Sequence, residues 1–226
     1  RRFCKTCKYP RLYEVEYIVL KKLIKVHTDS IVCLRYTNEQ QPLPLHKTLE
    51  GLHFMVEQQT DILRPETLIK EFKKNGVTHI ITIPDSETNY LYELMEKQDW
   101  LDVVPVAREG ESMSVAFGLT ITGKVPVVLI QNTGMMESGD SIRGTVLNAG
   151  FPLLMVVGYR GWTRKGKTPD SAATYTEPFL NAFRLDYYLV EHDDDGPRIS
   201  EAFEETRKTK RPVVVLIGDE YHGFNR

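Results

Sequence analysis

One stretch decides the fold: Val125-Pro126-Val127-Val128-Leu129-Ile130-Gln131-Asn132-Thr133-Gly134. Its apolar part is a continuous Val/Ile/Leu run, without the alternation of polar and apolar residues that a half-buried strand shows. Such a run is typical of a strand buried on both faces, as in a parallel sheet that is covered by helices on each side. Polar residues follow at once, so this strand carries its chemically useful side chains at its carboxyl end.

The same pattern, a short apolar run followed by a helical stretch, recurs from about residue 65 to residue 218. Arg64-Pro65-Glu66-Thr67 predicts a helix start, and Asn75-Gly76 predicts the end of that helix. Strands are predicted at 78–83, 103–106, 125–131, 153–158, 187–190 and 213–218, and further helices at 87–97, 110–121, 140–148, 177–183 and 197–209. This alternation predicts an α/β fold, a doubly wound, six-stranded, mostly parallel sheet with helices on both faces.

The overall composition is that of a globular protein. The 226 residues include 29 basic and 31 acidic side chains, and 41% of them are hydrophobic. A charge this close to neutral argues against a dedicated nucleic-acid binder. No uninterrupted apolar run approaches the roughly 20 residues of a membrane-spanning helix, so we expect a cytoplasmic protein that does not enter the membrane.

The charge is unevenly distributed along the chain. Residues 1–54 hold ten basic and five acidic residues, a net charge of +5, and the remainder holds 19 and 26, a net charge of −7. All three cysteines precede Met55, which is the first methionine. We therefore divide the chain into an N-terminal extension, 1–54, and a domain, 55–226. Two interpretations of the extension stay open: upstream sequence outside the native protein, or a genuine strand and helix packed on the domain.

The cysteine pair Cys4-x-x-Cys7 is a weak metal signal. No second Cys-x-x-Cys or His-x-His pair follows at the spacing of a zinc finger. We therefore predict no metal site within this chain.

The segments after the predicted strands are where a ligand should bind in such a sheet. Asp85 follows the first strand, Arg108-Glu109-Gly110-Glu111 the second, Gln131-Asn132-Thr133-Gly134 the third, and Arg160 the fourth. The chain contains no Gly-x-Gly-x-x-Gly, no Gly-x-x-x-x-Gly-Lys-Ser/Thr and no Gly-x-Ser-x-Gly. The commonest nucleotide-binding and hydrolase interpretations are thereby excluded, and a carboxylate at a helix start beside an amide-rich loop with a glycine turn remains.

These segments resemble the pyrimidine-binding (PYR) domain of thiamine diphosphate enzymes, in particular the sulfopyruvate and phosphonopyruvate decarboxylase group and its separate alpha subunits. In that family a strand ends in a Glu-Gly pair, a glycine follows nine residues after the Glu, and the next strand ends in Gln-Asn-Ser/Thr-Gly. Glu109, Gly118 and Gln131-Asn132-Thr133-Gly134 match this pattern in order. The resemblance covers about residues 60–218 and does not extend to residues 1–54.

The resemblance implies a role for each matching residue. The cofactor is activated by its own 4′-imino group, which forms only when a carboxyl group is hydrogen-bonded to N1′ of the aminopyrimidine ring. Glu109 takes this catalytic role, because its spacing to Gly118 fits the family. Glu111 is the rival, but two residues on a helix differ by about 200° in direction, so only one can face the ring. The other expected site residues are Pro84, Gln131, Asn132, Thr133 and Gly134 for the cofactor, and Asp85 and Arg160 for the substrate.

The resemblance also implies a partner. Thiamine diphosphate enzymes bind the diphosphate and Mg²⁺ through a second domain that carries Gly-Asp-Gly and a downstream Asn. Here the nearest sequences are Gly139-Asp140-Ser141 and Gly218-Asp219-Glu220, and neither matches. We therefore expect a separate diphosphate-binding β subunit, which supplies most of the Mg²⁺ ligands, in an α2β2 or larger assembly.

The expected reaction is decarboxylation of a small 2-oxo acid to an aldehyde and CO₂. The sequence leaves open whether the substrate tail is a sulfonate, a phosphonate or a carboxylate. Two alternatives also stay open: a subunit of a carboligase or 2-oxo acid oxidoreductase on the same domain, and a non-catalytic α/β regulatory module.

Overall fold

A computed structural model describes residues 63–84, 89–163 and 166–218. The predicted division at residue 55, the cysteines and Asp85 lie outside these residues and stay predictions. The elements in chain order are α3 (Pro65–Lys74), β1 (His79–Thr82), α4 (Asn89–Glu96), β2 (Asp102–Pro105), α5 (Glu109–Ile121), β3 (Pro126–Gln131), α6 (Asn132–Glu137), α7 (Gly139–Ser141), η1 (Ile142–Leu147), β4 (Leu154–Gly158), β5 (Trp162–Thr163), β6 (Gly166–Lys167), α8 (Ser171–Ala182), β7 (Asp186–Val190), η2 (Asp193–Asp195), α9 (Pro197–Thr209) and β8 (Val213–Ile217).

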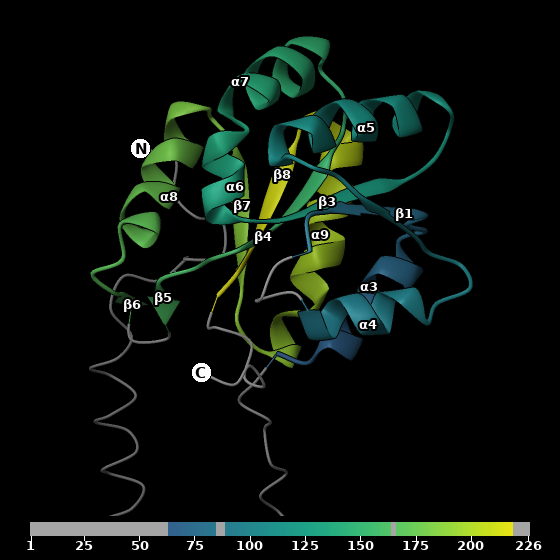
Figure 1. Cartoon of the computed structure of the whole chain (residues 1–226), viewed down its shortest axis with the longest axis horizontal. Helices are drawn as coiled ribbons and strands as arrows, with labels where there is room; N and C mark the ends of the chain where they lie inside the picture. Colours follow the sequence, from purple (N-terminus) through teal and green to yellow (C-terminus); the bar gives the residue numbers. More distant parts are fainter. Residues whose placement is uncertain (1–62, 85–88, 164–165, 219–226) are drawn as a thin grey trace, which may run out of the picture. The chain divides into compact units, whose positions relative to one another are not determined.

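The predicted sheet is confirmed. Its six strands lie in the order β2-β1-β3-β4-β8-β7, and every neighbouring pair is parallel. Helices α3, α4 and α9 cover one face, and α5, α6 and α8 cover the other (Figure 1). The carboxyl ends of all six strands therefore lie along one edge of the sheet.

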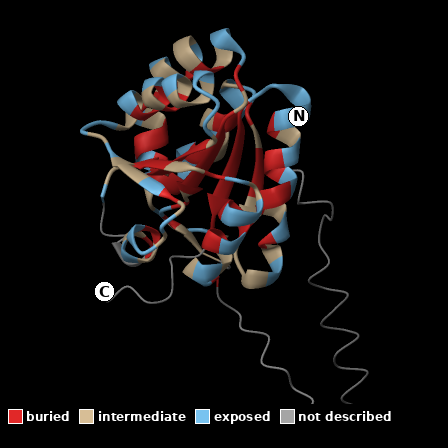
Figure 2. Ribbon diagram, turned by 90° about the vertical axis from the view of Figure 1, so that its right-hand side faces the viewer, coloured by how far each residue is buried: buried red, intermediate tan, exposed pale blue. Residues whose placement is uncertain are grey.

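The central strand β3 shows why a continuous apolar run was required. Val127 and Leu129 pack into the core below α3, α4 and α9, whereas Val128 and Ile130 pack into the core below α5 and α6. All four side chains are buried, and Figure 2 shows the same for most of the sheet. Both faces of the strand therefore exclude water, as the sequence predicted.

Two predicted segments differ from the structure. The helix expected at 177–183 begins at Ser171, because the Asp170 side chain accepts a hydrogen bond from the Ala172 amide (2.8 Å) and caps the helix there. Pro178 lies inside this helix and does not begin it. The helix expected at 140–148 is divided into α7 and the π-helical segment η1.

The predicted glycine turn after β3 is also wrong. Residues 132–137 form helix α6 directly after the strand, and Gly134 is its third residue, with no positive φ. A glycine at position 134 is therefore not explained by turn formation. It is explained by the close approach of the Glu109 side chain.

Candidate active site

The strand order places the candidate site. The chain leaves β1 toward β2 on one side and leaves β3 toward β4 on the other, although β1 and β3 are neighbours. Such a reversal is where doubly wound sheets open a crevice for ligands, at the carboxyl edge. Gln131 ends β3 at this edge, and Pro84 lies exposed two residues beyond the end of β1.

Glu109, the first residue of α5, lies directly against Gly134 of α6. A Cβ atom at position 134 would lie 2.7 Å from Glu109 Oε1 and 2.8 Å from Glu109 Cδ. Both distances are shorter than side-chain packing allows, so only glycine leaves room for the Glu109 side chain. The structure thus brings together two residues that are 25 positions apart in the chain.

Three carboxylates surround this helix start, and two of them have partners in the protein. The Glu111 side chain accepts a hydrogen bond from the Ala107 amide (3.2 Å). The Glu137 side chain accepts one from the Gly110 amide (3.0 Å) and pairs with Arg108. Glu109 is half-buried, and within residues 63–84, 89–163 and 166–218 its carboxylate makes no hydrogen bond or ion pair. It is therefore the carboxylate available to a ligand.

The three polar residues after β3 do not share one orientation. Thr133 is exposed, and its hydroxyl donates to the side-chain oxygen of Gln131 (2.8 Å). Asn132 is fully buried, and its amide nitrogen donates to the Thr176 hydroxyl (2.9 Å) and to the Arg160 carbonyl (3.0 Å). Gln131 and Thr133 can therefore reach a ligand at the sheet edge, whereas the Asn132 amide group fastens α6 to α8 and to the segment after β4.

Arg160 has a partner in the structure. Its guanidinium group lies 3.0 Å from the Asp170 carboxylate, the same side chain that caps α8. Arg143 likewise pairs with Asp140 one helical turn away (2.7 Å). An anionic substrate tail would therefore have to compete with Asp170 for Arg160.

No group of His, Cys, Asp and Glu side chains in the described part of the chain is arranged to hold a metal ion. Among the same residues no helix is long and apolar enough to cross a membrane.

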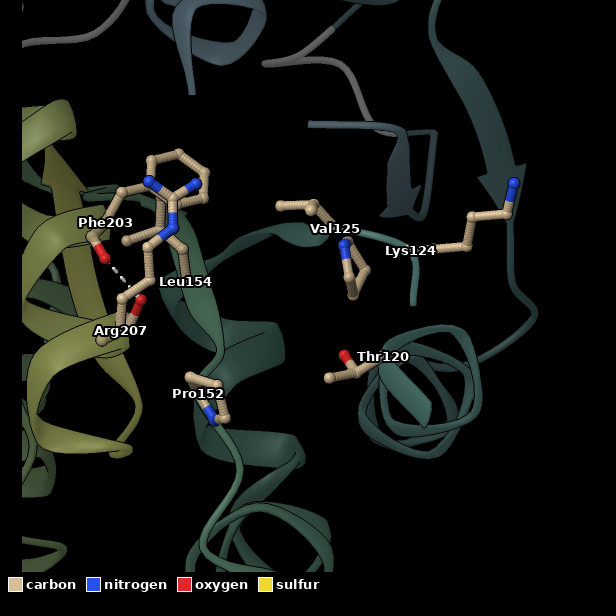
Figure 3. A pocket seen from close by; sticks show the side chains of 9 residues that line it. Thr120, Lys124, Val125, Pro152, Leu154, Phe203 and Arg207 are labelled. Atoms are coloured by element: carbon tan, nitrogen blue, oxygen red, sulfur yellow. Dashed lines mark hydrogen bonds between the residues drawn. The ribbon is translucent and has the colours of Figure 1, made fainter. Parts of the chain in front are cut away.

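A hollow lies at the opposite edge of the sheet, beside the amino ends of β3 and β4 (Figure 3). Thr120 of α5 lines one side, and Phe203 and Arg207 of α9 line the other. Thr120 already donates to the Ala116 carbonyl (2.8 Å), and Arg207 donates to the Asn75 carbonyl (2.6 Å). Because these polar groups have partners and face away from the carboxyl edge, the hollow is not part of the candidate site.

Glu137 was not among the site residues expected from the sequence. It lies one helical turn after Gly134 and therefore on the same side of α6. Its position would have been visible had residues 132–137 been predicted as a helix and not as a loop.

Comparisons with known proteins give relatives for this domain. Residues 65–176 match the family described as thiamine pyrophosphate enzyme, N-terminal TPP binding domain. The chain is 23% identical over 154 residues to the sulfopyruvate decarboxylase subunit alpha of Methanococcus maripaludis, covering 67% of this chain and 92% of that one. It is 27% identical over 160 residues to the protein of the same name from Methanothermobacter thermautotrophicus, covering 69% and 96%.

Solved structures share the fold. A 2-oxoglutarate:ferredoxin oxidoreductase from Magnetococcus marinus superposes with a TM-score of 0.54 at 17% identity, over 67% of this chain and 28% of that one. A structure described as a thiamin diphosphate-dependent enzyme from Mycobacterium smegmatis gives 0.53 at 18% identity, over 72% and 32%. This chain thus spans about a third of each of those chains.

The resemblance drawn from the sequence motifs is therefore confirmed: residues 65–176 match the N-terminal, TPP-binding domain family of thiamine pyrophosphate (thiamine diphosphate) enzymes.

Proposed function

We propose that this chain is the pyrimidine-binding α subunit of a thiamine diphosphate-dependent 2-oxo acid decarboxylase of the sulfopyruvate or phosphonopyruvate type. The observation that carries the proposal is Glu109. Its carboxylate is half-buried against Gly134 and has no partner among the described residues, while the neighbouring Glu111 and Glu137 are both hydrogen-bonded. This carboxylate lies beside a glycine at the crevice of a doubly wound sheet. It is suited to share a proton with a ring nitrogen of the cofactor.

The residues of this chain would serve the chemistry as follows. When bound, thiamine diphosphate supplies a nucleophilic carbon that adds to the 2-oxo group and accepts the electrons left behind as CO₂ departs. Glu109 holds the proton at N1′ of the aminopyrimidine ring. Gly134 keeps space for that carboxylate, and Gln131 and Thr133 offer polar groups at the same edge. Pro84, exposed two residues beyond the end of β1, is the proposed wall of the pyrimidine site.

The partner is part of the proposal. The relatives in Methanococcus and Methanothermobacter are named as alpha subunits, and this chain covers more than nine-tenths of each of them. We propose a β subunit that binds the diphosphate and Mg²⁺, joined to this chain as α2β2 or a larger assembly in the cytoplasm. The isolated chain should then bind thiamine diphosphate weakly, and tight binding measured by calorimetry would contradict this division of labour.

The substrate class rests on the relatives' names and stays broad. Sulfopyruvate is the first 2-oxo acid to test, followed by analogues with a phosphonate or carboxylate tail. Arg160 is the proposed contact for the anionic tail, since guanidinium pairs well with sulfonate or phosphonate oxygens. It must then exchange Asp170 for the substrate.

The deciding experiment compares two carboxylates that lie two residues apart. The chain is co-expressed with a candidate β subunit, recognised by Gly-Asp-Gly and a downstream Asn, and CO₂ and aldehyde release are followed. Glu109→Gln should lower turnover by roughly a hundredfold or more, as expected for a group that acts directly in proton transfer. Glu111→Gln, the matched control, should keep turnover within about threefold, because Glu111 is engaged with the Ala107 amide. Full activity of Glu109→Gln would favour a non-catalytic module.

A further inference from the structure

Glu137 contacts both chain neighbours of Glu109. One carboxylate oxygen accepts the hydrogen bond from the Gly110 amide (3.0 Å), and the other pairs with Arg108. The two carboxylate contacts thus fall on the residues immediately before and after Glu109. Gly134, one turn earlier on the same helix, lies against the Glu109 side chain itself. Helix α6 therefore fixes the start of α5 at three consecutive positions.

Helix α5 needs such a contact because its own cap is poor. Arg108 occupies the N-cap position and makes no side-chain capping hydrogen bond. The first amides of a helix have no partners within the helix, and an acceptor that satisfies one of them stabilises the helix start. Glu137 supplies this acceptor from 27 residues further along the chain, and its negative charge also suits the helix N-terminus.

The two contacts of Glu137 differ in how strongly they stabilise the start of α5. The Arg108 side chain is 75% exposed and that of Glu137 30%, so solvent screens their ion pair. The Gly110 contact is a charge-assisted hydrogen bond to the backbone of the helix that carries Glu109. A Cβ at position 110 would come within 3.1 Å of the Ser141 hydroxyl and 3.4 Å of Glu137 Oε2, which shows how closely the segments approach.

We propose that Glu137 is a positioning residue for Glu109. It holds the Gly110 amide and thereby sets the direction in which the first side chain of α5 leaves the helix. This proposal rests on the proposed function of Glu109. Glu137 itself needs no contact with cofactor or substrate.

The first test requires neither cofactor nor partner. Hydrogen exchange at the Gly110 amide is measured in the full chain for the wild type, Glu137→Gln, Glu137→Ala, Arg108→Ala and Asp140→Asn. Loss of a charge-assisted acceptor should make Gly110 exchange about tenfold faster or more in Glu137→Ala. Glu137→Gln keeps a neutral acceptor and should fall between Glu137→Ala and the wild type. Arg108→Ala should change little.

Asp140→Asn is the matched control. Asp140, like Glu137 and Gly110, lines a hollow beside the start of α5, and among the described residues it pairs with Arg143 of η1 alone. In Asp140→Asn the Gly110 amide should exchange at the wild-type rate. Unchanged Gly110 exchange in Glu137→Ala would overturn the proposal, whatever the fate of the activity.

The second test uses the complex with the β subunit. Glu137→Ala should lower kcat by about ten- to a hundredfold, since small misplacements of a reacting group are costly, and should leave KM for the 2-oxo acid within about twofold. Glu137→Gln should recover part of kcat. A wild-type kcat in Glu137→Ala together with fast Gly110 exchange would refute the positioning role and leave the role of Glu109 intact. Full activity of Glu109→Gln would instead refute the proposed function, and the exchange data would still report whether Glu137 caps α5.

Discussion

Replacing Gly134 by alanine would put a methyl group into the space that the Glu109 side chain occupies. The added Cβ would lie 2.7 Å from Oε1 and 2.8 Å from Cδ of Glu109. The clash includes Cγ of Glu109, so rotating only the carboxylate group cannot relieve it. Glu109 must adopt another side-chain conformation, or α5 and α6 must move apart.

The expected cost follows from this geometry. Forcing an extra methyl into a packed contact typically destabilises a protein by about 1–3 kcal/mol. In a Glu109→Ala background the clashing atoms are gone, and Gly134→Ala becomes an ordinary glycine-to-alanine change inside a helix, which stabilises by about 0.5–1 kcal/mol. The effect of one substitution thus changes sign with the residue at position 109, a coupling of about 1.5–4 kcal/mol.

The assay is urea unfolding of the full chain, followed by circular dichroism, for the wild type, the two single variants and the double variant. Gly118→Ala serves as the control, since Gly118 is inside α5 and a Cβ there meets no atom within 4 Å. It should stabilise by about 0.5–1 kcal/mol in both backgrounds. Equal effects of Gly134→Ala in the two backgrounds would refute the contact between Glu109 and Gly134 as described.

Three further outcomes are expected. Gly134→Ala in the complex with the β subunit should lower kcat by about a hundredfold, because the carboxylate is displaced, and near-normal turnover would count against Glu109 as the reacting carboxylate. Asn132→Ala should destabilise by about 1–3 kcal/mol in urea unfolding, since the Arg160 carbonyl and the Thr176 hydroxyl lose their donor, whereas the exposed neighbour Thr133→Ala should stay within about 0.5 kcal/mol. Burial, the hydrogen bond to Glu205 and the charge of that carboxylate raise the pKa of Tyr188 above its ordinary value of 10.0. The unfolded chain therefore ionises this phenol first, so wild-type stability falls as the pH rises above about 10, and Tyr188→Phe should show a shallower decline in urea unfolding at alkaline pH; identical slopes would contradict it.

Much of the sheet could be predicted from local sequence. Strands such as 213–218 are recognisable because burial on both faces admits only apolar residues. The helix at 197–209 was predicted with the bounds that the structure has, and Pro197, which suits the first helical turn, is the local signal for its start. These signals are local, and each is strong enough to be read without knowledge of the neighbours.

The errors fall where the reason for a residue is not local. Gly134 was interpreted as a turn residue, yet its lack of a side chain serves Glu109, which a different helix carries. The helix expected at 177–183 begins six residues earlier, at Ser171, because its start depends on the Asp170 cap. Glu137 was missed for the same reason, since its partners Arg108 and Gly110 are distant in sequence. The carboxyl edge of the sheet was predictable, but the contacts that orient its side chains depend on tertiary packing.

Gly134 and Glu137, the α6 residues that contact the start of α5, follow Glu109 at a distance along the chain, and this order has a consequence for synthesis. Glu109 leaves the ribosome before Gly134 and Glu137, and the strand β3 lies between them. Because β3 must join β1 before α6 can reach α5, the nascent chain holds an unsupported Glu109 until the central strand is in place. A fragment that ends before residue 125 would contain the proposed catalytic carboxylate and none of the α6 residues that orient it, so the domain cannot be shortened to its first strands without losing the site.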